Sequence, residues 1–559
     1  MTIAHTLVAL LWLAMLWYAA PLVSREQRID VPSRLRNMLA LLLAIPLVLA
    51  TLHLLYLASL LLAAAILCAM RAYFARDVAT PFDPWEALAA AVTLIVASPY
   101  IPRAPTDGDS LAYHLPDAIA WAQAHSFDPT WMRYWWYPPG SEISIAGVIA
   151  AGGLWITGIV SLLAAMMLTT RLVAWLRALD VPAPAAVALS AAFLTISTAA
   201  FQTYDQRNDL VLAAWFLESL WALRTRDWYG IVPIAALALM KPYGWVYALL
   251  AIFCMGRPRM LAGLIPVLLW SLHDMLLSPH AMNSIASTNA GVSWSTTILG
   301  NIPSSLAVLV ESFGARGPAT IVFFNAPFAG VFSRGEERRL AIIGIFSLLL
   351  FLLSPFGYAN NLPQLASGSS LRFDLPALVL GVLCLAPLAR RLSPWVAALS
   401  ILSALAGFAR LLFILNHNPS ILIAVCGASL AGFAVCLTFA TSLRRAAALA
   451  AGVASLGLFL YGSAMASANV VSFYGAPDSI YAWFHAHPHA AESVNLRAGT
   501  LLMLAPQARI IDADGIDCEG ARMAKAWIVA GTGDIRARDA RGCGRVLFSD
   551  STAVVVDPR

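Results

Sequence analysis

Long apolar runs recur along nearly all of the first 467 residues, and they constrain the fold of this chain more than any other feature. The chain has 559 residues, of which 60% are hydrophobic and only 12% are charged. A soluble protein carries about 25% charged residues, whereas a membrane-spanning helix needs about 20 consecutive apolar residues. The sequence therefore predicts a polytopic all-α membrane protein.

Arginine-rich turns separate the apolar runs in one consistent register. Placing all of these turns in the cytoplasm satisfies the positive-inside rule, and the loops between them are then external. We expect about 13–16 transmembrane helices. The predicted spans lie near residues 3–23, 38–53, 55–70, 84–101, 154–176, 183–200, 210–223, 229–240, 242–255, 260–278, 318–333, 340–355, 374–389, 395–415, 420–441 and 446–467. The run 38–70 fits either one long tilted helix or a tight hairpin around His53.

The segment Tyr229–Met255 decides the register of every later turn. As one helix it places Arg257 outside and inverts the basic turns that follow, whereas as a hairpin it keeps them all inside. Each arm of the hairpin has about 12–14 residues, or roughly 18–21 Å, against a bilayer core of about 30 Å. The tip at 240–244 is therefore predicted to stop at or below the outer headgroups. Short interrupted helices of this kind are tolerated where they line a cavity.

The tail differs in composition from the rest of the chain. We divide the protein into a polytopic region, 1–467, and a small extracytoplasmic α/β domain, 468–559. Short β-like runs between Gly and Asp turns predict strands at 509–511, 526–529, 545–548 and 553–556. Cys518 and Cys543 both lie in this tail, and an oxidising compartment favours a disulfide between them, although two free thiols are the alternative.

The predicted external loop 103–141 begins with an acidic signature. Asp107 and Asp109 stand two residues apart, ahead of the helical stretch Leu111–Ala124. A sheltered carboxylate at this place reaches water and lipid headgroups, and it suits the removal of a proton from an attacking hydroxyl. The alternative is that Asp109 caps the following helix, because Asp is a favoured N-cap residue. Aromatic residues crowd the same loop, and they suit either sugars or the bilayer interface.

A polar segment at 204–209 is the second candidate, because it abuts the apolar run that follows. Charged groups such as Arg207 and Asp209 are costly at this place unless they meet water, one another or a ligand. The alternative is a short external turn that contains an Asp205–Arg207 pair. His114 is a weaker candidate, because a histidine on an apolar face is more often a satisfied core group.

Two cations complete the candidate set. Lys241 lies at the tip of the predicted hairpin, where an ammonium group suits a lipid phosphate. The alternative is a lysine whose side chain extends to the surface. Arg372 enters a span from the outside, where the positive-inside rule disfavours it. A phosphate partner explains Arg372 well, and Asp374 is its alternative local partner.

These residues belong to a series of short motifs with a common external placement. The motifs are Asp109-Ser110-Leu111-Ala112-Tyr113 with His114-Leu115-Pro116, Tyr137-Pro138-Pro139, Asn208-Asp209-Leu210, Met240-Lys241-Pro242, Trp270-Ser271-Leu272-His273-Asp274 and Arg372-Phe373-Asp374-Leu375-Pro376. Over about Pro84 to Pro387 the chain resembles the GT-C membrane glycosyltransferases. This superfamily includes the protein O-mannosyltransferases, the lipid A aminoarabinose transferases and the bacterial RgtA/B/C/D-like group. The chain departs from the pattern at Ser110, Met240 and His273, where the family has an acid, a threonine and an arginine.

The resemblance implies a GT-C-like fold and a hexosyl- or pentosyltransferase that uses a sugar on a polyprenyl phosphate. Asp109, with Asp107 beside it, is implied as the catalytic carboxylate that deprotonates the acceptor hydroxyl as general base, and attack at the anomeric carbon inverts its configuration. The implied residues that bind lipid phosphate or substrate are Lys241, Arg372, Arg207, Asp209, Tyr113, His114 and Tyr137. No metal-ligand set is predicted, and the loss of the second acid at Ser110 leaves a divalent cation open as a cofactor.

The implied partners are the lipid-linked donor, the bilayer and an acceptor that is a glycan, a lipid or a protein. Scattered arginines at helix ends argue against nucleic-acid binding. The expected location is the inner (plasma) membrane, with the site and the C-terminus extracytoplasmic. Two other readings stay open: a transporter or flippase of lipid-linked sugars, which predicts inverted repeats that the sequence lacks, and a noncatalytic membrane partner.

Overall fold

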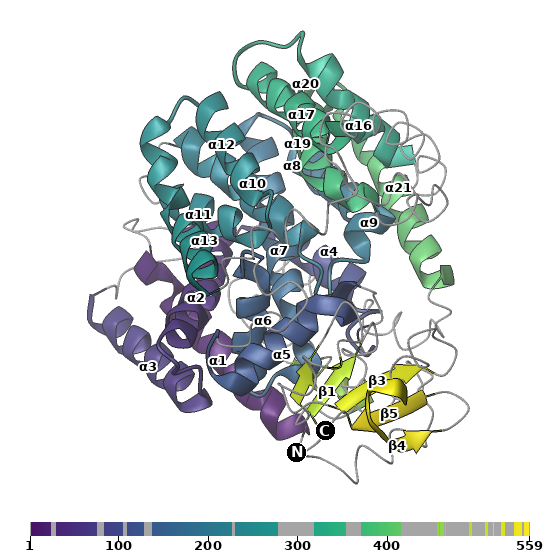
Figure 1. Ribbon diagram of the computed structural model, residues 1–559. Helices are drawn as coiled ribbons and strands as arrows, with labels where there is room; N and C mark the ends of the chain where they lie inside the picture. The colour runs from purple at the N-terminus through teal and green to yellow at the C-terminus, as the bar shows by residue number, and fades with distance from the viewer. Residues whose placement is uncertain are drawn as a thin grey trace.

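The computed structural model describes most of the helical region and the strands of the tail (Figure 1). The described residues are 2–23, 29–74, 83–103, 105, 109–127, 137–225, 230–277, 318–353, 370–414, 456–457, 459–462, 464–465, 491–494, 509–511, 518, 527–531, 541–549 and 553–557.

The helical region packs many helices around one shared apolar core. Its α-helices are α1 (Thr2–Ala19), α2 (Val31–Thr51), α3 (Leu57–Phe74), α4 (Pro84–Ala97), α5 (Leu115–Ala124), α6 (Gly140–Ala150), α7 (Ile159–Ala178), α8 (Ala183–Leu194), α9 (Ser197–Ala200), α10 (Asp209–Thr225), α11 (Ile231–Met240), α12 (Gly244–Cys254), α13 (Ile265–Leu277), α16 (Pro318–Gly330), α17 (Gly335–Leu353), α19 (Leu375–Cys384), α20 (Ala386–Arg391) and α21 (Ser393–Ile414). The 3₁₀ segments are η1 (Ala20–Val23), η3 (Leu154–Ile156), η5 (Pro258–Leu264) and η6 (Ser370–Asp374), and η2 (Ser110–His114) is a π-helical turn.

Length and apolar surface make this a polytopic membrane protein. Within the described residues, seven helical segments are long and apolar enough to cross a bilayer, and six shorter apolar helices accompany them. The peripheral helices expose large apolar side chains, such as Leu62 on α3, Leu276 on α13 and Leu402 on α21, which are 62%, 76% and 63% exposed. Soluble proteins rarely expose so much apolar surface, and such a surface is expected where helices contact lipid.

Several predicted boundaries hold and some do not. The run 38–70 is broken, because α2 ends at Thr51 and His53 adopts a left-handed φ of 59° before α3 begins. The hairpin reading of 229–255 is confirmed by α11 and α12, which contact each other on either side of a short turn. Helix α6 was not predicted, because most of it lies between the predicted external loop 103–141 and the predicted span 154–176. The predicted span 420–441 lies outside the described residues, and 446–467 is described only in short pieces.

The arginine-rich turns meet at one end of the helical bundle. Arg224, at the end of α10, pairs with Glu336 at the start of α17 over 2.5 Å. Arg390 in α20 pairs with the neighbouring Glu337 over 2.6 Å. These contacts join three turns that the positive-inside rule assigned to one side. Because Asp209 opens α10 and Arg224 lies in its last turn, the two residues are roughly 22 Å apart along the helix axis.

The tail contains one five-stranded sheet, drawn in yellow in Figure 1 near both chain ends and α5. Its strands are β1 (Ala491–Val494), β2 (Arg509–Ile511), β3 (Trp527–Gly531), β4 (Arg545–Ser549) and β5 (Ala553–Asp557), in the order β2-β1-β3-β5-β4. β1 is parallel to both β2 and β3, whereas β5 is antiparallel to β3 and β4. Four of the five strands match the predicted runs. β1 was missed because Ala491-Glu492-Ser493-Val494 has no apolar run.

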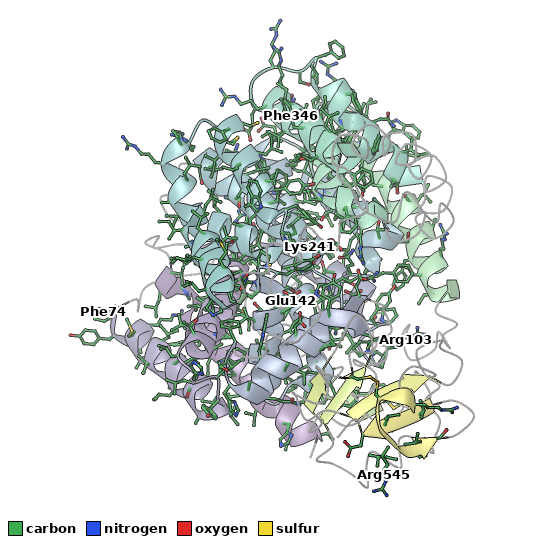
Figure 2. All side chains as sticks on the ribbon, viewed as in Figure 1. Phe74, Arg103, Glu142, Lys241, Phe346 and Arg545 are labelled. Atoms are coloured by element: carbon green, nitrogen blue, oxygen red, sulfur yellow. A yellow bond between two sulfur atoms is a disulfide. The ribbon has the colours of Figure 1, made fainter. Side chains whose placement is uncertain are left out.

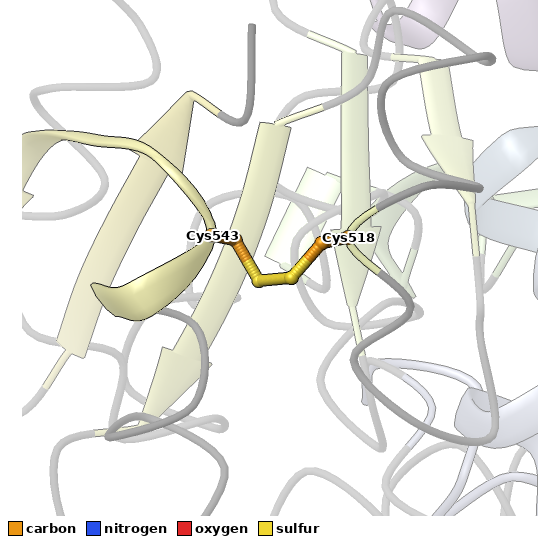
Figure 3. The surroundings of a disulfide bond; sticks show 2 residues. All are labelled: Cys518 and Cys543. Atoms are coloured by element: carbon orange, nitrogen blue, oxygen red, sulfur yellow. A yellow bond between two sulfur atoms is a disulfide. The ribbon is translucent and has the colours of Figure 1, made fainter.

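A disulfide links the region before β3 to the region before β4 (Figure 3). Cys518 and Cys543 are joined, their Cα atoms lie 5.3 Å apart, and 25 residues separate them in sequence. Cys543 is almost fully buried, with 2% of its surface exposed. Three other cysteines lie among the described residues as free thiols: Cys384 is buried, and Cys68 and Cys254 are half-buried.

Candidate active site

Four charged side chains from four separate segments meet at the end of the bundle opposite the arginine contacts. They are Asp109, Asp209, Lys241 and Arg372. Arg372 pairs with Asp109 through its terminal nitrogen, and its Nε lies 3.3 Å from Oδ2 of Asp209. The Lys241 ammonium pairs with Oδ1 of the same Asp209. The two carboxylates and two cations therefore form a single connected group whose formal charges cancel.

The local backbone explains how three of these groups reach one place. Asp209 opens α10, where a carboxylate is favoured by the helix dipole. Lys241 follows the last residue of α11 in an extended conformation, and a cation near a helix C-terminus is favoured for the same reason. Gly244 begins α12 directly afterwards, and its N–H donates to the Lys241 carbonyl over 2.8 Å, which closes the turn. Arg372 lies in η6 just before α19.

Asp109 is positioned for contact with a cation rather than for helix capping. It precedes the π-helical turn η2, and its side chain makes no capping hydrogen bond to that turn. Asp109 thus holds the N-cap position of η2 without capping the turn through its side chain. About a quarter of its side chain is exposed, so it is the most accessible of the four charged groups. Burial by itself would raise the pKa of Asp109, but the positive charge of Arg372, together with that of Lys241, outweighs it and holds the pKa below the ordinary aspartate value.

Lys241 and Arg372 are buried, each with 7% of its surface exposed. The alternative that Lys241 extends to the surface is therefore wrong. Aromatic rings fill the space beside both cations: the Phe373 ring centre lies 5.1 Å from the Lys241 ammonium and 5.0 Å from the Arg372 guanidinium. The hydroxyl of Tyr243 donates to Asp209 over 3.1 Å. Such a dry, aromatic surrounding strengthens every electrostatic contact inside it.

The other predicted residues fall into two groups. Tyr113, His114 and Tyr137 lie together beside Asp109, because the ring centres of the two tyrosines are 6.3 Å apart and those of Tyr113 and His114 are 4.0 Å apart. Arg207 instead pairs with Asp205, with Nε donating over 2.6 Å, as the local-turn alternative predicted. Asp107 lies outside the described residues.

Glu142 is a member of the site that was not predicted from the sequence, whereas its neighbour Asn208 belongs to the candidate segment 204–209. Glu142 of α6 is 4% exposed and lies 2.5 Å from Nδ1 of His114. The amide of Asn208 donates to the Met240 carbonyl over 2.9 Å and lies 3.4 Å from Glu142. Figure 2 labels Glu142 and Lys241 near the centre of the molecule. The signal for Glu142 was available, since a carboxylate that opens an apolar run is costly without partners.

In the part of the chain that the structure describes, no three His, Cys, Asp or Glu side chains group so that they could hold a metal ion. The two acids of the site are instead paired with cations. The histidine-rich stretch of the tail, 485–489, lies outside the described residues.

No family model matches the chain, and neither does any curated protein. Among solved structures, the chain is similar to ArnT from Cupriavidus metallidurans in the apo state, with 16% sequence identity and a TM-score of 0.48. The match covers 84% of this chain and 97% of ArnT. A match at this identity and TM-score is too distant to carry an inference about chemistry, so the function rests on the residues of the site.

Proposed function

We propose that this protein is an integral membrane glycosyltransferase that moves a sugar from a polyprenyl-phosphate donor to an acceptor hydroxyl. One observation carries the proposal: Lys241 and Arg372, far apart in sequence, lie together with Asp109 at the bundle end opposite the arginine contacts. Two buried cations next to an accessible carboxylate provide an anion site and a base in one place. By the positive-inside rule this end is extracytoplasmic, and the disulfide in the tail agrees with an oxidising compartment.

The donor phosphate would take over the cations from their carboxylate partners. Lys241 and Arg372 would hold the departing lipid phosphate, because fixed positive charge is most effective where negative charge develops in the transition state. Asp109 and the phosphate must flank the sugar for displacement with inversion. Entry of the sugar would therefore separate Asp109 from Arg372.

This separation would also activate the base. While Asp109 is paired with Arg372 its pKa is lowered, so it is a weak proton acceptor. When Arg372 turns to the phosphate, the carboxylate loses that stabilisation and its basicity rises. It can then remove the proton of the acceptor hydroxyl as the oxygen attacks the anomeric carbon. The arrangement thus links base strength to the presence of the donor.

The test is the release of polyprenyl phosphate from a panel of synthetic polyprenyl-phosphate hexoses and pentoses, measured with purified protein and a mixture of acceptors. Asp109→Asn should keep the protein folded and lower the rate by about 10²–10⁴, the usual contribution of a general base. Lys241→Ala should weaken use of the lipid donor. The matched control is Glu337→Gln, the same change at an arginine-paired carboxylate at the other end of the bundle. Undiminished transfer by Asp109→Asn would remove Asp109 from the mechanism.

A further inference from the structure

Next to Asp109 lies a buried histidine–glutamate pair that the proposed mechanism does not yet use. His114 ends the π-helical turn η2 and is 1% exposed, and Glu142 of α6 is 4% exposed. Nδ1 of His114 and Oε1 of Glu142 are 2.5 Å apart. Because an ionised carboxylate only accepts hydrogen bonds, Nδ1 of His114 carries a proton in this contact. In the neutral imidazole, Nε2 then presents its lone pair.

Both residues keep one atom without a partner. Within the described residues, Nε2 of His114 and Oε2 of Glu142 are buried and make no hydrogen bond. A buried polar atom of this kind costs about 1–3 kcal/mol. Each such group in a folded protein therefore needs an explanation, and a catalytic role is one of the recurrent ones.

The backbone brings this pair to the reaction centre. A π-helical turn hydrogen-bonds residues five apart, and it joins Asp109 at its start to His114 at its end. Single π-turns of this kind occur frequently at functional sites. Asn208 adds a second connection, because its amide lies 3.4 Å from Glu142 and donates to the carbonyl of Met240, the residue before Lys241.

Because Asp109 and Asp209 are both paired with cations, the reaction needs another group that can take up the proton, and the His114–Glu142 pair is such a group. Asp109 must return to its ionised form to pair with Arg372 again, so it cannot keep the proton that it removes from an acceptor. Asp209 is occupied by Lys241, Arg372 and Tyr243. His114 is the neighbouring group that can take up a proton, and Glu142 is placed to balance the charge that results.

We propose that His114, oriented by Glu142, receives at Nε2 the proton that Asp109 removes from the acceptor hydroxyl. This rests on the proposed function. In the first step the hydroxyl O–H bond breaks, the oxygen bonds to the anomeric carbon, and the bond from that carbon to the phosphate oxygen breaks with its electron pair on the phosphate. In the second step the Asp109 carboxyl passes its proton to His114, and the imidazolium is balanced by the Glu142 carboxylate. The proton then leaves to water or to the departing phosphate.

This relay predicts a specific pH dependence. The charged or titratable groups around the imidazole are Glu142 from α6, Asp109 and Tyr113 on its own turn, and beyond Asp109 the Arg372 and Lys241 cations. A protonated imidazole cannot accept a second proton. The kcat of the wild-type protein should therefore fall with decreasing pH as the imidazole becomes protonated.

Two conservative variants separate the relay from a structural role. His114→Asn keeps an amide donor at the position of Nδ1, so it retains the contact with Glu142 but removes Nε2. Glu142→Gln keeps the shape and removes the charge. The matched control is His125→Asn at the C-cap of α5, where Nδ1 contacts the Leu55 carbonyl over 3.0 Å and the φ of 59° suits asparagine.

The measurement is kcat against pH for polyprenyl-phosphate release from the donor of the panel that is turned over fastest. His114→Asn should lower kcat by about 100-fold with donor KM unchanged and should lack the acid limb. Glu142→Gln should move that limb to lower pH, because the imidazolium loses its balancing charge. His125→Asn should match the wild type.

The possible outcomes separate failure of the relay from failure of the proposed function. A His114→Asn variant with the wild-type kcat and pH profile would overturn the relay while Asp109→Asn still abolishes transfer and upholds the proposed function. A lower kcat with an unchanged pH profile would mean that the pair only holds η2 against α6, which also overturns the relay. Transfer by Asp109→Asn at the wild-type rate, or no release from any donor of the panel, would overturn the proposed function and the relay with it.

Discussion

Asp209 is the residue whose replacement tests the anion site most directly. Its buried carboxylate accepts from Lys241 and Tyr243 and lies 3.3 Å from Nε of Arg372. A lipid phosphate that binds these cations must compete with Asp209. Replacing Asp209 with Asn removes one negative charge at nearly constant shape, and the formal charge of the four-residue group changes from zero to +1. We therefore expect the variant to bind polyprenyl phosphate more tightly than the wild type.

The size of the effect follows from electrostatics. Two negative charges about 5 Å apart repel by roughly 3 kcal/mol at an effective dielectric constant of about 20. Relaxation of the cations toward solvent reduces this value, so we expect a gain of about 1.4–2.7 kcal/mol, or about 10- to 100-fold in affinity. The free protein should at the same time be less stable by about 3–5 kcal/mol, because a buried ammonium loses its partner.

Binding of undecaprenyl phosphate to purified protein in detergent, measured by calorimetry, supplies the readout. The control is Glu218→Gln, which makes a matching change in the same helix, because Glu218 lies near the middle of α10, away from the site, and accepts from Arg171 over 2.7 Å. It should leave lipid affinity unchanged. The lipid should also raise the melting temperature of Asp209→Asn more than that of the wild type. A folded Asp209→Asn protein with equal or weaker affinity would show that the phosphate does not bind at Lys241 and Arg372.

Three further predictions concern the α11–α12 turn, the disulfide and the Asp109–Arg372 ion pair. Gly244→Ala should destabilise the α11–α12 turn and reduce lipid binding, because a Cβ at this position would overlap the Leu237 carbonyl; melting temperature and lipid affinity should fall together. Cys518→Ser should abolish the shift in gel mobility that reduction causes in the wild type, since Cys518 pairs with Cys543. Although burial raises the pKa of Asp109, the neighbouring cations lower it overall, so the stability from this ion pair should be constant above about pH 5 and be lost only as the pH falls through the lowered value. Thermal unfolding between pH 3 and 8 should show this loss, and it should be smaller in Asp109→Asn.

The sequence predicted the membrane class and the register of the chain because both depend on local composition. Apolar runs near the bilayer thickness and arginine-rich turns are read directly along the chain. The hairpin that ends at Lys241 followed from the same rule. The strands of the tail were predicted wherever β-branched and apolar residues cluster, and β1 was missed because it lacks such a cluster.

Only the tertiary structure decided which charges face one another. Asp109 and Arg372 are 263 residues apart in the sequence, and the folded chain pairs them directly. Arg207 carries the same charge as Arg372 but pairs with its own neighbour, Asp205. Contacts between side chains that are distant in sequence depend on how the helices pack, and a partial rotation of one helix about its axis changes them. The contact of Glu142 with His114 depends on helix packing in the same way, although a carboxylate that opens an apolar run was visible in the sequence.

In this structure carboxylates balance the charges of the buried Lys241 ammonium and Arg372 guanidinium, and in the proposed function a donor phosphate takes the place of these carboxylates. Composition indicated that the chain spans a membrane, and the arginine-rich turns predicted which loops share a side. Packing established that four distant residues share one small, dry volume, because burying any one of these charges alone would cost several kcal/mol.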